Sequence, residues 1–523
     1  MKVSLATNTF HHVTLNPKMN TVFKKIIIFV VIAELCSLNL LCFAKPLKAI
    51  KNSPKLAINE SLSEPINIKN NTKPPSDPNL FKQNISSPIM LEARIDQPTD
   101  FDYKQILNIA VKNNLDILQA NQNAKIQKWK WIENVGGFLP DYSLGVNWTR
   151  FNGTILLAGI LPVGDVGNTG ANAFMRLDYM VFNGGKNLAN TLISKKLFNA
   201  ANNNIDVAMQ DILLAVTKSY NSLIREQAKL NVILHAVEES KADLKLNSDL
   251  ERQGVGTKFD VLQSTSLLSE QEQLLIRQQA LFRQASITLS SLLNIDQGAH
   301  IRPDKNDLRP RTLYDINKPI EEMIKTAKEN RSDYKKLKQE YNSKRHSIGA
   351  ALGDYLPTAN IFGEYAGRGN YFFKSDDERG RQLDSSSTYG FAVNWAPTKG
   401  LGVPILARIK QAKEEVAMYQ TKLDQLESKI EKEVRTAYLN AQSTESLLDV
   451  SNRRVDVAKE ALRLAKVRLE NGIGINTELL NSQTEYKNAL FTKVDAIVEH
   501  NNSQAELLHA LGIISINTLT IDS

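Results

Sequence analysis

The sequence repeats itself at an offset of 217–218 residues, and this duplication restricts the chain to folds built from two similar halves. Three pairs of segments keep the offset: Leu139-Pro140 with Leu356-Pro357, Gly254–Gly256 with Gly472–Gly474, and Asp260–Ser264 with Glu478–Ser482. Self-similarity at a fixed period is the signature of a repeated structural unit. We therefore expect a first structural repeat at 99–300 and a second at 301–514, followed by a C-terminal tail at 515–523.

Each half contains a long segment with the spacing of a coiled-coil helix. In the second half, apolar residues recur at alternating steps of three and four: Ile409, Ala412, Val416, Tyr419, Leu423, Leu426 and Ile430. This pattern predicts a narrow helix seam over about 402–470, and its counterpart lies over about 186–252. At 1.5 Å per residue, each helix would be on the order of 100 Å long.

Shorter helices flank the long ones, so that each half has the order helix, strand, strand, long helix, short helix. The short helices are predicted at 102–134, 257–294, 319–352 and 476–512. Two of them stacked end to end would match the length of one long helix. A rod of this kind cannot bury its own apolar surface, so it needs neighbours of the same kind.

Four segments alternate between apolar and polar residues, at about 141–151, 171–182, 358–368 and 386–396. In the first, Leu144, Val146 and Trp148 share one face and polar residues share the other. One apolar and one polar face over about ten residues is typical of a membrane β-barrel strand, although a half-buried soluble sheet has the same period. The strands would form two hairpins with polar loops at 152–170 and 368–386.

Four strands are too few to close a membrane barrel. The smallest such barrels have about 8 strands, and open strand edges are not tolerated in lipid. The subunit is therefore expected to oligomerise, and the alternation alone leaves open whether two, three or four chains close the barrel. The alternative from another class, a periplasmic coiled-coil scaffold without a pore, would not need four strands with aromatic faces.

The first 44 residues predict a secretory signal peptide. Lys24-Lys25 precedes the apolar run 26–32, and the small residue Ala44 closes the segment. An N-terminal transmembrane anchor is the alternative, but Glu34 interrupts the run of about 20 apolar residues that a span needs.

The start of the mature chain is less regular. Met1 and Met19 are both candidate starts, because Met19 lies closer to the basic pair of the leader. The segment 45–98 is rich in Lys, Asn, Ser and Pro and shows no helical or strand period. We expect a disordered N-terminal extension there.

The residues after the leader do not support catalytic or metal-binding chemistry. Both cysteines, Cys36 and Cys42, lie in the predicted signal peptide, so thiolate sites and disulfides are excluded after it. The histidines lack metal-ligand spacing, and the Gly254–Gly256 turn lacks the third glycine and preceding strand of a phosphate loop. The net charge of +8 is scattered, which argues against nucleic-acid binding. We expect no enzymatic activity, no cofactor and no metal.

Three local patterns occur in order along the chain. They are Leu139-Pro140 and Leu356-Pro357 before the first strand of each half, Phe182-Asn183-Gly184-Gly185 at a strand end, and the turn Gly254–Leu262. With them, residues 101–514 resemble the TolC family of outer-membrane efflux and secretion channels. The second half departs from the pattern at the strand end, where Trp395–Gly400 replaces Phe-x-Gly-Gly.

This resemblance implies a mainly α-helical fold with a membrane β-barrel. A homotrimer would close a twelve-stranded barrel, with four strands from each chain, and would form a helical coiled-coil tunnel across the periplasm. The implied function is a passive exit duct in the cell outer membrane, within a tripartite efflux or type I secretion system, for small molecules or polypeptides. The implied partners are a periplasmic adaptor protein, an inner-membrane transporter and outer-membrane lipid.

Two carboxylates are candidates for a gate. Asp260 and Glu478 occupy equivalent positions about one turn into the helix that follows each glycine turn. The resemblance implies that Glu478 and Asn481 match an acidic ring that narrows the periplasmic mouth of the tunnel. Carboxylates that converge from several copies favour cations. An alternative role for Asp260 and Glu478 is to cap their helix N-termini, where acids are stabilising, and the two roles are compatible.

The glycine turns are also candidates for adaptor contact, because glycine permits a tight reversal and leaves a small, bare loop. The residues of the two tips are Gly254, Val255, Gly256 and Thr257, and Gly472, Ile473, Gly474 and Ile475.

Overall fold

The computed structural model describes residues 99–520, apart from 101, 158–160, 299–300, 304–306, 370–383, 397–401 and 472. The expected signal peptide at 1–44 and the expected extension at 45–98 lie outside these residues. The described chain divides into two compact units. One holds Asp141–Asp178 and Ile361–Gly390, and the other holds the remaining described residues. Each unit takes residues from both sequence halves, so the compact units do not coincide with the two repeats.

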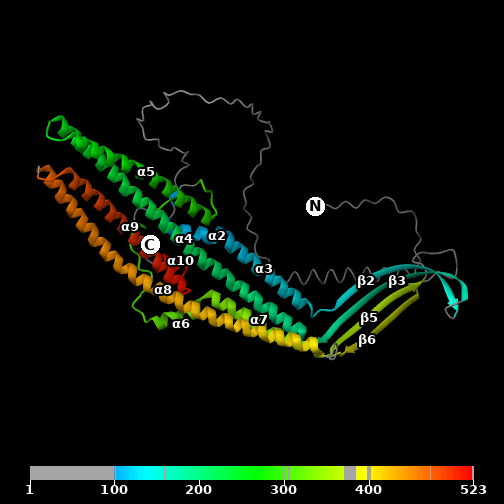
Figure 1. Cartoon of the computed structure of the whole chain (residues 1–523). Helices are drawn as coiled ribbons and strands as arrows, with labels where there is room; N and C mark the ends of the chain where they lie inside the picture. The colour runs from blue at the N-terminus through cyan, green and yellow to red at the C-terminus, as the bar shows by residue number, and fades with distance from the viewer. Residues whose placement is uncertain are drawn as a thin grey trace, which may run out of the picture. The chain divides into compact units, whose positions relative to one another are not determined.

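Four strands form one sheet in the order β2-β3-β5-β6 (Figure 1). Their bounds are Asp141–Leu157 for β2, Leu161–Asn183 for β3, Thr358–Gly369 for β5 and Asp384–Asn394 for β6. β2 and β3 pair antiparallel, with a register that runs from Asp141 opposite Asp178 to Leu157 opposite Leu161. The loop expected at 152–170 is therefore wrong, because only 158–160 separate the two strands. Most of the loop expected at 368–386 lies outside the described residues.

The two faces of the sheet differ in polarity as the alternation predicts. Leu144, Val146 and Trp148 are exposed on the apolar face. On the polar face, the Arg176 guanidinium lies 2.7 Å from the Asp178 carboxylate and 3.6 Å from that of Glu364. Successive strand residues point to opposite faces, so this ion cluster and the exposed apolar side chains occupy opposite sides of the sheet.

Two very long helices dominate the other unit: α4 (Lys186–Arg252) and α8 (Val403–Glu470). The heptad pattern predicts 186–252 and 402–470 for them. The helices α5 (Lys258–Leu293) and α9 (Asn476–Ala510) return along them, α5 against α4 and α9 against α8 and α4 (Figure 1). Seam residues of α8 such as Ala412, Leu423 and Ile430 are buried within the chain.

The helices expected at 102–134 and 319–352 are each broken in two, which corrects the sequence-based prediction. The pieces are α2 (Tyr103–Asn113), α3 (Leu115–Gly136), α6 (Ile320–Asn330) and α7 (Ser332–Gly353). Asn114 has an extended backbone and caps α3, since its side chain accepts hydrogen bonds from the Asp116 and Ile117 amides. At the second break, Arg331 is extended and its buried side chain bonds to carboxylates of Asp333 and Glu433.

Further short elements occur that the sequence pattern does not predict. The strand β1 (Thr99–Asp100) pairs in parallel with β4 (Ile301–Arg302). The segment expected to be a C-terminal tail contains α10 (Ile516–Leu519), and its Leu519 is buried. No helix in the described part of the chain is both long enough and apolar enough to cross a membrane.

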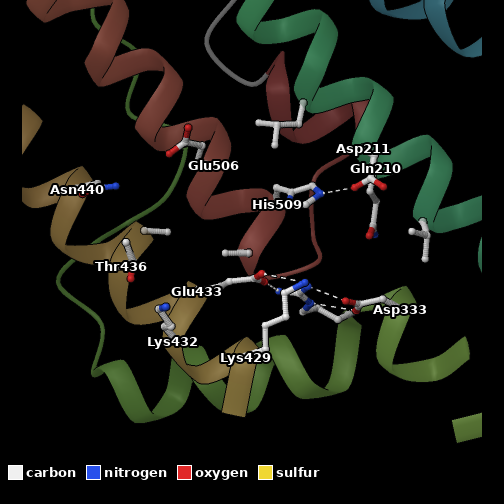
Figure 2. A pocket seen from close by; sticks show the side chains of 15 residues that line it. Gln210, Asp211, Asp333, Lys429, Lys432, Glu433, Thr436, Asn440, Glu506 and His509 are labelled. Atoms are coloured by element: carbon white, nitrogen blue, oxygen red, sulfur yellow. Dashed lines mark hydrogen bonds and ion pairs between the residues drawn. The ribbon is translucent and has the colours of Figure 1, made fainter. Parts of the chain in front are cut away.

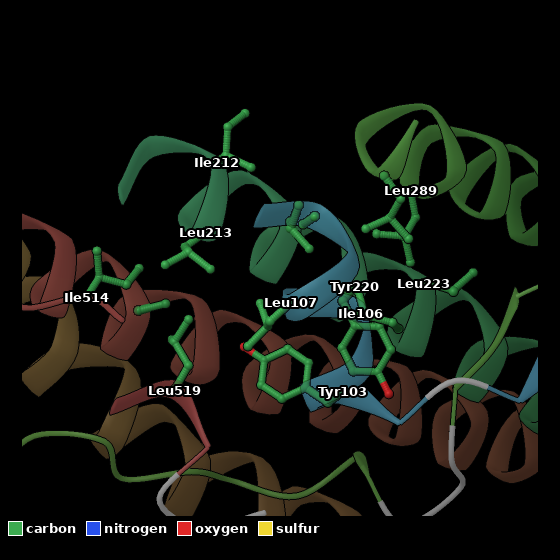
Figure 3. Packing of buried hydrophobic residues seen from close by; sticks show 14 of the residues in the cluster. Tyr103, Ile106, Leu107, Ile212, Leu213, Tyr220, Leu223, Leu289, Ile514 and Leu519 are labelled. Atoms are coloured by element: carbon green, nitrogen blue, oxygen red, sulfur yellow. The ribbon is translucent and has the colours of Figure 1, made fainter. Parts of the chain in front are cut away.

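The largest apolar cluster joins the ends of the chain to the middle of α4 (Figure 3). Its fully buried members include Tyr103 and Leu107 from α2, Leu213 and Tyr220 from α4, Leu289 from α5 and Leu519 from α10. A second cluster packs Met323 and Ala327 of α6 against Ile430 and Val434 of α8. Both clusters lie near mid-length of the long helices, where the shorter helices begin and end.

Candidate functional site

The two helix hairpins reverse direction with the same backbone geometry. In the first, the amides of Val255 and Gly256 both donate to the carbonyl of Leu250 at 3.0 Å. In the second, the amides of Ile473 and Gly474 both donate to the carbonyl of Arg468 at 2.9 Å. These bonds span the left-handed residue that typically ends a helix.

Glycine is required at these turns for two different reasons. Gly254 has φ +77°, a left-handed conformation that glycine adopts without steric cost. A Cβ on Gly474 would lie 2.9 Å from the backbone nitrogen of Leu469, so a side chain there would displace the helix end. Gly472, the counterpart of Gly254, lies outside the described residues.

Both tips present apolar side chains to solvent. Val255 is 78 % exposed and Ile473 is 74 % exposed, and Ile475 is exposed as well. Phe259, in the first turn of α5, is also exposed, and the sequence-based set of tip residues does not include it. Adjacent exposed apolar side chains on a soluble surface mark a contact site.

Asp260 lies in a capping box at the start of α5. Its amide donates to the Thr257 hydroxyl oxygen at 3.2 Å, and its carboxylate accepts from the Thr257 amide at 3.3 Å. The Thr257 hydroxyl also lies 2.6 Å from the Asp260 carboxylate. These are the contacts expected of a helix N-cap.

We expect Asp260→Ala to weaken the first turn of α5 by about 1 kcal/mol, the usual loss for a removed cap. Hydrogen exchange of the amides at the start of α5 would measure this directly. Lys258→Ala, an exposed change in the same turn, is the matched control and should leave the exchange rates unchanged. Equal protection in Asp260→Ala and the native chain would contradict the capping role.

Glu478 has different surroundings from its counterpart. Ile475 is the N-cap of α9 and has no side-chain capping bond. The Glu478 carboxylate instead lies 3.6 Å from the Arg468 guanidinium, on the other arm of the same hairpin, and both side chains remain accessible to solvent. Asn481, one turn further along α9, is exposed.

A buried polar network joins the two hairpins close to their tips. The Asn247 amide donates to the Ser264 hydroxyl at 2.7 Å and to the Asn476 side-chain oxygen at 3.2 Å. All three side chains are buried. The network therefore ties α4 and α5 of the first hairpin to α9 of the second. Sequence reasoning missed it, although a polar residue such as Asn247 at a seam position of a long helix is the signal that would have found it.

Further along the same interface, Lys487 of α9 is buried and its ammonium donates to the Gln271 side-chain oxygen at 3.1 Å. Burial lowers the pKa of Lys487, and the carboxylate of Glu270 opposes this only in part. The Gln483 amide donates to the Asp243 carboxylate at 2.6 Å. The lower hairpins are thus held together by polar contacts. Across the described ranges, no group of three or more His, Cys, Asp or Glu side chains is placed to hold a metal ion.

The fold is similar to that of several solved outer-membrane channels. The structure of the outer-membrane channel OprN matches with a TM-score of 0.65 and 16 % identity, over 78 % of this chain and 89 % of that chain. The Campylobacter jejuni CmeC outer membrane channel matches with a TM-score of 0.66 and 15 % identity, over 78 % and 84 %. The outer membrane protein VceC from Vibrio cholerae matches with a TM-score of 0.65 and 15 % identity, over 78 % and 95 %.

At the level of sequence, no curated protein matches this chain. The sequence model of the outer membrane efflux protein family matches residues 107–294 and 323–513, one range in each half. These ranges cover well over half of the chain and contain both long helices and both hairpin tips. The resemblance to TolC-family channels is therefore confirmed, and the chain belongs to the outer membrane efflux protein family.

Proposed function

We propose that this chain is the passive exit duct of a tripartite efflux or type I secretion system and exports small molecules or polypeptides. The observation that carries the proposal is a sheet of only four strands, with exposed apolar side chains on one face, in a chain with helices on the order of 100 Å long. Such a sheet must be completed by other copies before it can lie in lipid. Three copies would give a barrel of twelve strands above a tunnel of long helices. A periplasmic scaffold without a pore has no use for this sheet.

The partners in this proposal are a periplasmic adaptor and an inner-membrane transporter. The adaptor would dock on the hairpin tips, because they expose apolar side chains at the end of the helices. Both tips have the same backbone turn, so three copies would offer six similar contact points to one adaptor ring.

We expect single cysteines at the tips to cross-link to the adaptor in cells. The described residues contain no cysteine, so Val255→Cys or Ile473→Cys would be the only thiol after the predicted signal peptide. Treatment of cells with a bifunctional maleimide should join each variant to a periplasmic adaptor with an introduced tip cysteine, and efflux should persist before treatment. Lys413→Cys, on exposed α8 far along the chain from both tips, is the control and should give no adduct. Adducts at Lys413→Cys alone would place the adaptor elsewhere.

A gate at the tips is the second part of the proposal. Glu478 is accessible and makes no capping bond, so its carboxylate is available to line a ring at the mouth of the tunnel. Asn481 occupies the next turn of the same helix without a charge. Opening of this mouth would move one hairpin away from the other and break the buried Asn247 network.

We expect Glu478→Gln to lower the cation selectivity of single channels in planar bilayers, because it removes one carboxylate per copy from the ring. Asn481→Asp should raise the selectivity for the opposite reason. Glu460→Gln is the control, since Glu460 forms an exposed pair with Arg463 on α8, away from the tip. Unchanged reversal potentials in both Glu478→Gln and Asn481→Asp would remove these residues from the constriction.

A further inference from the structure

A recess opens where α9 ends and α7 begins, at mid-length of α4 and α8. Its volume is about 560 Å³, and four segments line it: α4, the Arg331 break, α8 and the end of α9 (Figure 2). Cavities of about 300–1,000 Å³ are the usual size for small-molecule sites. The recess lies in the helical unit alone and is separate from the hairpin tips.

The recess occupies the side of the helix layer away from the apolar clusters. Leu213 and Val216 of α4 pack into the cluster that contains α2 and α10, and Ile430 of α8 packs against α6. Asp211 and Lys432 line the recess instead, from other faces of the same helices. In a closed ring of copies, a second layer of helices cannot fit inside the tunnel. On the proposed duct, the recess therefore opens to the tunnel lumen.

The floor of the recess is fixed by a buried arginine. The Arg331 guanidinium is buried and donates to the carboxylates of Asp333 at 2.6 Å and Glu433 at 2.5 Å. Burial disfavours the charged form of Asp333, but hydrogen bonds and charge from Arg331 outweigh it and hold the pKa of Asp333 below its usual value. The backbone of Gly512 packs directly against Arg331, which leaves no room for a side chain. These groups satisfy one another and provide a rigid base.

The walls of the recess carry opposite charges. Lys429 and Lys432 come from α8, and Lys432 is exposed without a salt bridge within the described residues. Asp211 of α4 and Glu506 of α9 come from the facing side, as Figure 2 shows. The Asp211 side chain is 59 % exposed even though one oxygen lies 2.8 Å from the His509 ring. A solute with a single charge would be attracted by one wall and repelled by the other.

We propose that this recess is a transit site for small zwitterionic solutes that carry an ammonium and a carboxylate group. The solute carboxylate would face Lys432 and Lys429, and its ammonium would face Asp211 and Glu506. Both solute charges are then paired, and the rigid Arg331 base keeps the walls apart. Conduction requires binding that is favourable enough for entry and weak enough for release, and exposed charge pairs of this kind bind weakly. The inference rests on the proposed duct for its position in the lumen.

Three small peptides would test the charge requirement on the purified full-length protein in detergent. The probes are triglycine, N-acetyl-triglycine and triglycine amide, and ligand-observed NMR titration measures their binding. We expect saturable binding of triglycine, and about tenfold weaker binding of each blocked peptide, the loss expected for one charged contact. No saturable binding of triglycine, or equal binding of all three probes, would overturn the proposal.

Variants of the exposed wall residues locate the site. Lys432→Gln should remove the discrimination against triglycine amide, and Asp211→Asn should remove that against N-acetyl-triglycine. Lys413→Gln, also on exposed α8 but outside the recess, should change neither. An equal effect of Lys413→Gln and Lys432→Gln would show that binding is elsewhere. Channel conductance and tip cross-linking of the same variants separate the two proposals, because both should persist if the duct is right and the recess binds nothing.

Discussion

Gly184→Ala is expected to prevent correct assembly of the protein in the outer membrane. Gly184 lies between β3 and α4 with φ +67°, and a Cβ there would overlap the carbonyl oxygen of Gly353 at the end of α7. The left-handed conformation costs an L-residue about 1–2 kcal/mol, and displacement of a packed neighbour typically adds about 1–3 kcal/mol. The neighbour here is backbone, so no side-chain rotation can relieve the overlap.

Gly185→Ala is the matched control for this prediction. Gly185 has φ +79°, but a Cβ there would have no atom within 4 Å. Only the conformational cost of about 1–2 kcal/mol should remain, so we expect the variant to assemble. Outer-membrane fractions of both variants, compared by chemical cross-linking and gel electrophoresis, give the measurement. Equal assembly of Gly184→Ala and Gly185→Ala would show that the approach of Gly353 is not required.

The same comparison explains the irregular strand end in the second half. Gly185 is the N-cap of α4, and Gly402 is the N-cap of α8 with a similar φ of +77°. The glycine that corresponds to Gly185 is therefore Gly402, two residues beyond the Trp395–Gly400 segment that breaks the motif. The motif is conserved in conformation at its last position, although its letters are displaced.

The long helices were predictable because a heptad seam is set by side-chain spacing alone. The breaks at Asn114 and Arg331 were harder to predict, since neither position carries a proline or glycine. Asn114 stops a helix through its own capping bonds, a signal present in the sequence as an asparagine followed by Asp116. Arg331 stops one through tertiary contacts with Glu433, about a hundred residues away, which no local pattern contains.

The strand ends and the recess show the same limit. Residues 152–157 and 161–170 contain several Gly and Asn residues and read as loop, yet the two segments pair with each other and continue β2 and β3. Cross-strand pairing decided the outcome over local propensity. The recess at mid-length depends on where α7 starts and α9 ends, so it became visible only once the break at Arg331 was known.

The connection between the two halves is held by a buried ion pair against two aromatic rings. The Arg311 side chain is 6 % exposed, donates to the Asp307 carboxylate at 2.9 Å and lies 4.8 Å from the centre of the Tyr103 ring. Tyr103 stacks on Tyr220, whose hydroxyl donates to Asp307. Burial raises the pKa of Tyr103 to about 12 and raises that of Tyr220 further. Both tyrosines are therefore neutral at physiological pH, and Arg311 alone balances the charge of Asp307.

We expect Arg311→Met to lower the free energy of unfolding by about 3–5 kcal/mol, because it leaves the carboxylate of Asp307 without its cation. Guanidinium unfolding followed by far-ultraviolet circular dichroism measures the change. Lys325→Met, an exposed change on α6, is the control and should stay within about 0.5 kcal/mol of the native chain.

The double variant with Asp307→Asn distinguishes loss of a charge pair from loss of packing. If the uncompensated carboxylate is the cause, Asp307→Asn in the Arg311→Met background should recover part of the lost stability, since the buried charge is gone and the Tyr220 hydroxyl still has an oxygen to bond. If the arginine acts only by packing on Tyr103, the double variant should be no more stable than Arg311→Met. The cluster pins the connecting segment to α2 and α4 in the first case and merely fills space in the second.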